Sequence, residues 1–124
     1  MNPHLDRFNK ALRRLQEALD APAGDLVRDA SIQRFEFTFE LAWKAIKNTA
    51  TAEGLECMSP RSCLKLAFGQ GWIDEEPIWL SMLDDRNRAS HTYDERLAEQ
   101  LYGRLPDYLN PFRRLLEMLE NKSA

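Results

Sequence analysis

Residues 32–46 read IQRFEFTFELAWKAI and carry the clearest helical pattern in the chain. Its apolar side chains step along the chain by three or four residues, at Ile32, Phe35, Phe39, Ala42 and Ile46. That spacing places them on one face of an α-helix. The same stepping continues on both sides of the stretch and predicts a helix over residues 25–53, about 40 Å long at 1.5 Å per residue. Gly54 is the expected end of this helix.

Phe37 does not fit that apolar face. It lies two residues from Phe35, which is about 200° around a helix, so the two rings point in different directions. A helix with large apolar side chains on two sides is buried on two sides. We therefore expect a second copy of the chain to cover Phe37 in a symmetric homodimer.

The rest of the chain also has a helical pattern. Leucine occurs 18 times, whereas valine and isoleucine together occur five times, a ratio that favours helices over strands. We expect further helices over residues 3–20, from Ser59-Pro60 to before Gly69 or Gly71, over 75–90, and over 95–120. Asp74 and Asp94 are the expected N-caps of the last two. Because the apolar stripe runs through Pro106 and Pro111 without a phase break, we expect one kinked helix there. The prediction is an all-α, antiparallel up-and-down four-helix bundle with one extra short helix, in a single domain over residues 1–124.

Composition excludes several classes of protein. The chain has 124 residues and a formal net charge of −3, which argues against coating nucleic acid by bulk charge. No apolar run is long enough to span a bilayer, and the N-terminal residues lack the apolar stretch of a signal peptide. We therefore expect a cytoplasmic protein with no membrane partner. The two cysteines, Cys57 and Cys63, are expected to be reduced and partly buried.

The candidate site is residues 84–94, which read DDRNRASHTYD and join the last two predicted helices. His91 can accept and donate protons near neutral pH, and Arg86 offers a planar cation that suits phosphate oxygens. Together they could cleave RNA without a metal ion. The two residues lie about 140° apart on a helix, so a joint site requires the helix to end near Ser90, the long reach of arginine, or a second subunit. The alternative is a polar helix end in which His91 is only a cap.

Two other polar sets admit two interpretations each. Glu36 and Glu40 lie one helical turn apart. They either belong to a solvated face or form ion pairs, with Lys44 or with arginines such as Arg34 or Arg86, or they have a functional role such as binding a metal. Arg61, Lys65, Arg86 and Arg88 form either a basic cleft or scattered surface charge. The five glycines are isolated, so no phosphate-binding loop is predicted, and we expect neither a cofactor nor a metal.

Several motifs resemble one family in the right order. Arg86, His91 and Tyr93 match the RX4HXY motif of HepT-like proteins in the HEPN superfamily. Residues 31–44 resemble the second helix of nucleotidyltransferase substrate-binding proteins, and residues 59–61, 71–74 and 79–82 resemble later landmarks of that group. The resemblance covers about residues 5–119.

The resemblance implies a dimeric helical bundle partnered with a minimal nucleotidyltransferase. In the HepT-like branch the protein is a toxin ribonuclease with Arg86 and His91 as its catalytic pair. The partner acts as antitoxin by transferring AMP to the tyrosine, here Tyr93. We expect RNA or nucleotide contacts from the polar residues Asn87, Arg88, Ser90 and Arg61. The alternative that the resemblance leaves open is a non-catalytic accessory subunit that binds substrate for the nucleotidyltransferase.

Overall fold

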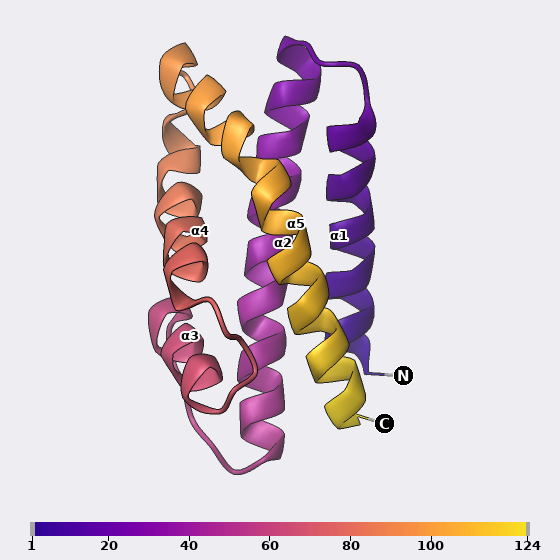
Figure 1. The fold of residues 1–124 in the computed structure, drawn as a ribbon, viewed down its shortest axis with the longest axis vertical. Helices are drawn as coiled ribbons and strands as arrows, with labels where there is room; N and C mark the ends of the chain where they lie inside the picture. The colour runs from indigo at the N-terminus through magenta and orange to yellow at the C-terminus, as the bar shows by residue number, and fades with distance from the viewer. Residues whose placement is uncertain (1, 124) are drawn as a thin grey trace.

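The computed structural model describes residues 2–123 and contains only helices and their connections in that range. The helices are α1 (Pro3–Asp20), α2 (Asp25–Ala52), α3 (Pro60–Gly69), α4 (Glu76–Arg88), the 3-10 helix η1 (Ala89–His91) and α5 (Glu95–Ser123). The long helices alternate in direction, and the chain begins and ends at the same end of the bundle (Figure 1). The predicted all-α, up-and-down bundle with one short extra helix is confirmed.

Aromatic rings form the centre of the core. Phe35 of α2 stacks on Tyr108 of α5 with ring centroids 5.5 Å apart. Phe112, also on α5, meets Phe8 of α1 at 6.0 Å and Trp79 of α4 at 5.5 Å, both edge to face. Such rings contribute through buried area and through favourable edge-to-face geometry. Four helices therefore meet at one aromatic cluster, and the apolar stripe predicted around Phe35 is the buried face of α2.

The helix ends follow local sequence signals in most places. The Ser59 side chain accepts a hydrogen bond from the Ser62 amide, with Pro60 in the first turn of α3. Asp94 accepts from the amides of Arg96 and Leu97 at the start of α5. Gly54 follows α2 with φ +76°, a conformation that glycine adopts without steric cost. The expected cap at Asp74 is wrong: α4 begins at Glu76, and neither Asp74 nor Glu75 caps it with its side chain.

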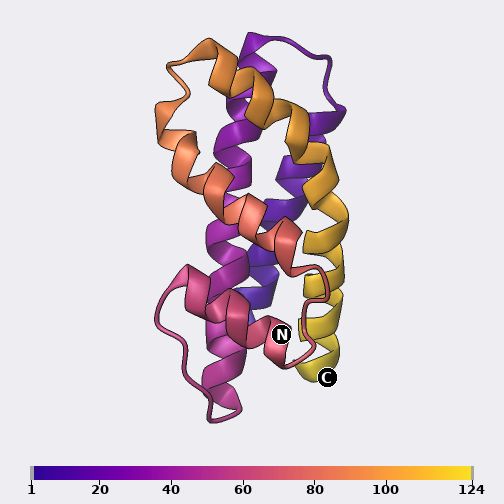
Figure 2. The same cartoon turned by 60° about the vertical axis from the view of Figure 1, so that its left-hand side comes forward.

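α5 continues through both of its prolines, as predicted. Pro106 is exposed and Pro111 is buried. A proline inside a helix removes one backbone donor and bends the helix, and α5 follows a bent path across the bundle (Figures 1 and 2).

The expectation of two reduced thiols is wrong for this structure, because Cys57 and Cys63 form a disulfide. Cys57 lies just before the Ser59 cap, and Cys63 lies in the first turn of α3. The capped turn folds the chain back on itself and leaves the two Cα atoms 5.0 Å apart, within the range for a bridge. Both residues are buried.

None of the helices within residues 2–123 combines the length and the apolar character that crossing a bilayer requires.

Candidate functional site

The candidate site lies where α4 ends and the chain turns into α5. α4 ends at Arg88, and His91 is the last residue of the short helix η1. The α-helix therefore stops before His91, which is one of the conditions under which Arg86 and His91 can serve one site. No hydrogen bond joins their side chains among the described residues.

Asp85 anchors the end of α4 from the core side. Its carboxylate is fully buried and accepts two hydrogen bonds from Arg104, at 2.6 and 2.9 Å, and one from the Tyr108 hydroxyl at 2.5 Å. Arg88 donates to the same carboxylate at 3.3 Å. Burial, with the hydrogen bond to Asp85, raises the pKa of Tyr108 to about 12, so the phenol stays protonated. This network fixes the helix turn that carries Arg86.

Asp85 is absent from the residues predicted for the site, although the sequence contains a signal for it. It falls three residues after Met82 and four before Ala89, so it occupies a position on the buried stripe of α4. A charged residue on an apolar stripe needs partners on a neighbouring helix. Arg104 and Tyr108 are spaced four apart on α5 and supply them.

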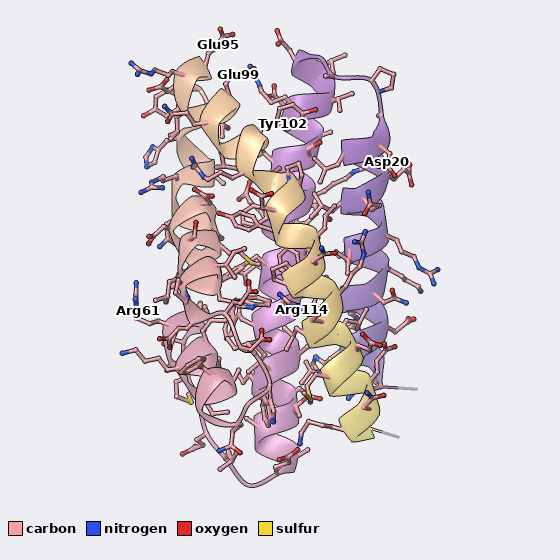
Figure 3. The ribbon with its side chains drawn as sticks, viewed as in Figure 1. Asp20, Arg61, Glu95, Glu99, Tyr102 and Arg114 are labelled. Carbon is pink, nitrogen blue, oxygen red and sulfur yellow. A yellow bond between two sulfur atoms is a disulfide. The ribbon has the colours of Figure 1, made fainter. Side chains whose placement is uncertain are left out.

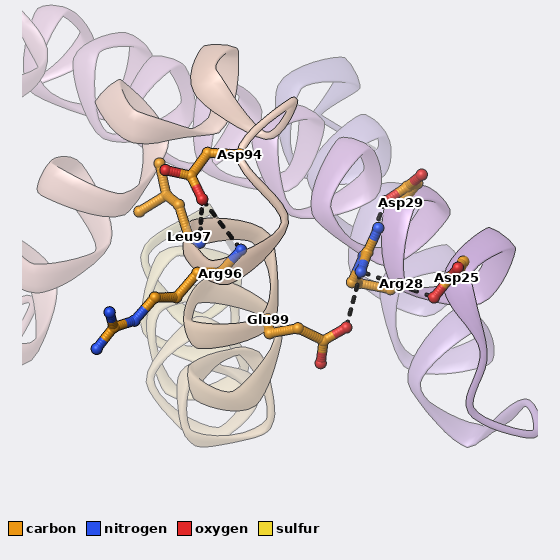
Figure 4. A network of polar contacts seen from close by, with 7 residues as sticks. All are labelled: Asp25, Arg28, Asp29, Asp94, Arg96, Leu97 and Glu99. Atoms are coloured by element: carbon orange, nitrogen blue, oxygen red, sulfur yellow. Dashed lines mark hydrogen bonds and ion pairs between the residues drawn. The ribbon is translucent and has the colours of Figure 1, made fainter.

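A second ion-pair network, also absent from the sequence prediction, fixes the start of α5. The Arg28 side chain is 7% exposed and bonds Asp29 at 3.0 Å and Glu99 at 2.7 Å. Asp25 lies 3.7 Å from the same guanidinium. Figure 4 shows this cluster between α2 and α5, with the Asp94 cap at the start of α5. The two networks hold the two ends of the segment that carries His91.

The guanidinium of Arg86 lies against α2. Its Nη2 donates to Glu40 Oε1, and Nη1 lies 3.4 Å from Asn87 Oδ1. Lys44 also reaches Glu40, with its Nζ 3.7 Å from Oε2. Burial raises the pKa of Glu36, one turn earlier on α2, and the positive charge of Arg86 partly opposes that shift. Of the ion pairs that the sequence allows for Glu40, the structure forms those with Lys44 and Arg86.

His91 and Tyr93 face solvent together. The Tyr93 hydroxyl lies 3.4 Å from His91 Nδ1, and the rings meet edge to face with centroids 5.8 Å apart. Tyr93 is 82% exposed and takes no part in the core. A phenol in this position is accessible to a modifying enzyme, and any group added to it would stand beside the imidazole.

The remaining predicted site residues are placed less closely together. Asn87 is exposed beside Arg86 and Ser90 is exposed beside His91, whereas Arg88 is engaged with Asp85. Arg61 projects outward from α3, well below the α4–α5 turn that Glu95 marks in Figure 3. Within one chain Arg61 does not join the other residues, and its role in substrate binding stays a prediction.

The face of α2 that carries Phe37 is open to solvent. Phe37 is 56% exposed and lines a groove of about 410 Å³ between α1 and α2. Apolar side chains, including Leu41, share the groove with four cations, Arg7, Lys10, Arg14 and Arg34. Among residues 2–123, no group of three or more His, Cys, Asp or Glu side chains could hold a metal ion.

Comparison with known proteins places these features in a family context. Residues 3–121 match the family described as nucleotidyltransferase substrate binding protein like. A Haemophilus influenzae protein named probable ribonuclease HepT is 30% identical over 104 residues, which cover 80% of this chain and 71% of the relative.

Two solved structures share the fold. A protein from Thermus thermophilus superposes with a TM-score of 0.86 at 40% identity, covering 90% of this chain and 98% of that one. A Haemophilus influenzae protein, described as revealing the fold of a substrate binding domain of a nucleotidyltransferase, gives a TM-score of 0.83 at 26% identity. That match covers 94% of this chain and 98% of the other.

Proposed function

Because this chain belongs to the nucleotidyltransferase substrate binding protein like family and is homologous to a probable HepT ribonuclease, we propose that it is a HEPN-type toxin. It acts as a homodimeric, metal-independent endoribonuclease. A minimal nucleotidyltransferase encoded with it is the antitoxin and silences it by transferring AMP to Tyr93. Its substrate is cellular RNA, and it acts in the cytoplasm.

One observation carries this proposal: the exposed Tyr93 hydroxyl lies 3.4 Å from His91 Nδ1, beside the helix end that carries Arg86. A histidine needed for proton transfer and the hydroxyl that would switch it off thus share one solvent-facing turn. An adenylyl group on Tyr93 would occupy the space in which RNA must approach His91.

The chemistry requires no metal. His91 removes the proton of a ribose 2′-OH, and the 2′-oxygen attacks the adjacent phosphorus. The bond to the 5′-oxygen of the next nucleotide breaks, that oxygen takes the proton that His91 now carries, and the products are a 2′,3′-cyclic phosphate and a 5′-hydroxyl. Arg86 stabilises the charge that gathers on the phosphoryl oxygens in the transition state. General base catalysis by a positioned side chain contributes about 10²–10⁴ in rate.

The test is cleavage of total cellular RNA by the purified protein in EDTA, with His91→Ala beside the wild type. His4→Ala is the matched control, because His4 is the only other histidine and lies on α1. We expect cleavage by the wild type and by His4→Ala, and at least about a 100-fold loss in His91→Ala. Intact RNA with all three proteins, when mass spectrometry finds Tyr93 unmodified, contradicts the ribonuclease proposal.

A second function is favoured by the state of Arg86, whose charge is already neutralised by Glu40. In that case the bundle is a non-catalytic accessory subunit that binds substrate for the nucleotidyltransferase. The discriminating measurement is nucleotidyl transfer by the partner in the presence of wild type or His91→Ala. Equal stimulation by both proteins, without RNA cleavage by either, supports the accessory role.

A further inference from the structure

The ion pair between Arg86 and Glu40 joins the proposed catalytic helix end to the central buried helix of the bundle. Glu40 lies near the middle of α2, between the core residues Phe39 and Ala42, and its side chain is 29% exposed. Arg86 is 33% exposed. The carboxylate is thus attached to a rigid element, whereas the arginine stands at a helix end close to a turn.

The contact uses only part of the donor capacity of Arg86. A guanidinium has five N–H groups in a fixed fork, and Glu40 takes one from Nη2 while Asn87 takes a long bond from Nη1. The other N–H groups have no partner among the described residues. Anchoring Nη2 on Glu40 restricts the rotation of the group and leaves donors free for a phosphate.

The same contact has an electrostatic cost. Glu36, Glu40, Lys44 and Arg86 lie together around this part of α2, and their formal charges cancel. A carboxylate beside a phosphate site weakens the attraction of RNA. A residue that acted only through charge would therefore impair the site, and its removal would improve RNA binding.

We propose that Glu40 is a positioning residue of the ribonuclease site. By accepting a hydrogen bond from Nη2 of Arg86, it orients the guanidinium so that the remaining N–H donors face the scissile phosphate. This inference rests on the proposed ribonuclease function. It also assigns a role to a residue outside the RX4HXY segment, 46 positions away in the sequence.

Glu40 and not Glu36 has this role, because only Glu40 bonds Arg86 among the described residues. Lys44 contacts the second oxygen of Glu40 and restrains the carboxylate in turn. The positive charge of Arg86 lowers the pKa of Glu36, but no hydrogen bond joins the two side chains among the described residues. Replacing Glu36 by glutamine is therefore expected to leave the orientation of Arg86 intact.

The experiment measures kcat and KM on one labelled RNA oligonucleotide that the wild type cleaves in EDTA. Glu40→Ala is expected to lower kcat by about 10- to 100-fold, the size of effect that misplacing a catalytic group produces. Its KM is expected to stay unchanged or fall, because a negative charge near the phosphate is lost. Glu40→Gln keeps an acceptor oxygen, so its kcat is expected to fall less than that of Glu40→Ala. Glu17→Gln is the control, because Glu17 also faces an arginine across two helices, Arg34 at 4.0 Å, away from the site.

The inference is overturned if kcat of Glu40→Ala is unchanged or higher, if only KM changes, or if Glu17→Gln loses as much activity. A ¹⁵N spectrum of the arginine side chains provides a readout independent of turnover. In the wild type, the guanidinium of Arg86 should rotate slowly and give separate N–H signals. These signals should merge in Glu40→Ala and stay separate in Glu36→Gln. A wild type that cleaves no RNA refutes the proposed function, whereas active wild type with fully active Glu40→Ala refutes only the role of Glu40.

Discussion

Three carboxylates near the candidate site have different roles because their surroundings differ. Asp85 is fully buried and accepts hydrogen bonds from Arg104, Tyr108 and Arg88, so its charge is compensated inside the protein. Glu40 is partly exposed and holds Arg86. Glu36 is partly buried without a bonded cation among the described residues, and its pKa is raised. The chemistry of each group follows from its neighbours and not from its residue type.

Removing the Asp85 carboxylate leaves Arg104 and Tyr108 without their shared partner. Removing one member of a buried ion pair lowers the free energy of unfolding by about 3–5 kcal/mol. Because Arg104 is partly exposed, we expect a loss at the low end of this range. We expect Asp85→Ala to lower the free energy of unfolding by about 3 kcal/mol in urea titrations. Asp107→Ala, an exposed position on α5, should change it by less than about 0.5 kcal/mol. Equal effects of the two substitutions would show that the network does not hold the helix end.

Glu36 gives the fold a pH dependence of defined sign. Burial raises its pKa in the folded chain, so the folded state favours the protonated form more than the unfolded chain does. Its contribution to stability is therefore present below the unfolded pKa of about 4.3 and is lost as pH rises through the higher folded pKa. At neutral pH the charged side chain costs stability.

Glu36→Gln removes that cost. Because solvent screens a partly exposed group, we expect a gain of about 0.5 kcal/mol or less in the free energy of unfolding at pH 7. The gain should shrink toward zero at pH 4. Urea titrations of both proteins at the two pH values measure it, and a gain that is larger at pH 4 than at pH 7 would reverse the sign argued here.

At the scale of elements, helix periodicity predicts most of the fold because it reports which face of each helix is buried. The stripe through Phe35 and Phe39 predicts α2 nearly to the residue, and the stripe through Pro106 and Pro111 predicts one helix in spite of two breakers. A cap is a weaker signal: Asp94 caps α5, but α4 does not begin directly after Asp74.

Long-range partners are what the sequence does not reveal. The motif at Arg86 and His91 is local and visible, whereas the pairing of Arg86 with Glu40 depends on how α4 lies on α2. The Arg28 and Asp85 networks depend likewise on the placement of α5. The Cys57–Cys63 disulfide escapes prediction for another reason, since two cysteines in a chain of this composition indicate thiols whereas the geometry of the capped turn brings the two residues together.

That disulfide gives a prediction for α3. It closes a loop with a sequence separation of 6 residues, and in the chain-entropy model such a short loop stabilises by about 2 kcal/mol. We expect reduction with dithiothreitol to lower the free energy of unfolding by about that amount. The double variant Cys57→Ser with Cys63→Ser should be insensitive to the reductant. An unchanged stability of the wild type under reduction would show that the bridge adds nothing to the folded state.

At the scale of the whole molecule, the bundle buries one face of α2 and leaves another uncovered. Phe35 and Phe39 lie in the core with no exposed surface, whereas Phe37 between them is 56% exposed. The groove beside Phe37 runs along α1 and α2, and Glu40, which holds Arg86, is about one turn away on the same helix. A second copy seated on this face would therefore lie next to the proposed catalytic arginine.

Phe37→Ser tests the proposed dimer. Burying one aromatic side chain contributes about 2 kcal/mol to the free energy of dimerisation, and a symmetric interface buries Phe37 from both subunits. Losing both contributions, about 4 kcal/mol, should raise the dimer Kd by about 1000-fold. Phe68→Ser is the matched control, because Phe68 is 45% exposed on α3, away from this groove. Sedimentation velocity should find Phe37→Ser as a monomer and Phe68→Ser as a dimer at the same concentration. If the site is shared between subunits, the rate of RNA cleavage by Phe37→Ser falls as the fraction of dimer falls, and it recovers at protein concentrations high enough to restore the dimer. Cleavage by the isolated monomer at the wild-type rate would show that each chain carries a complete site.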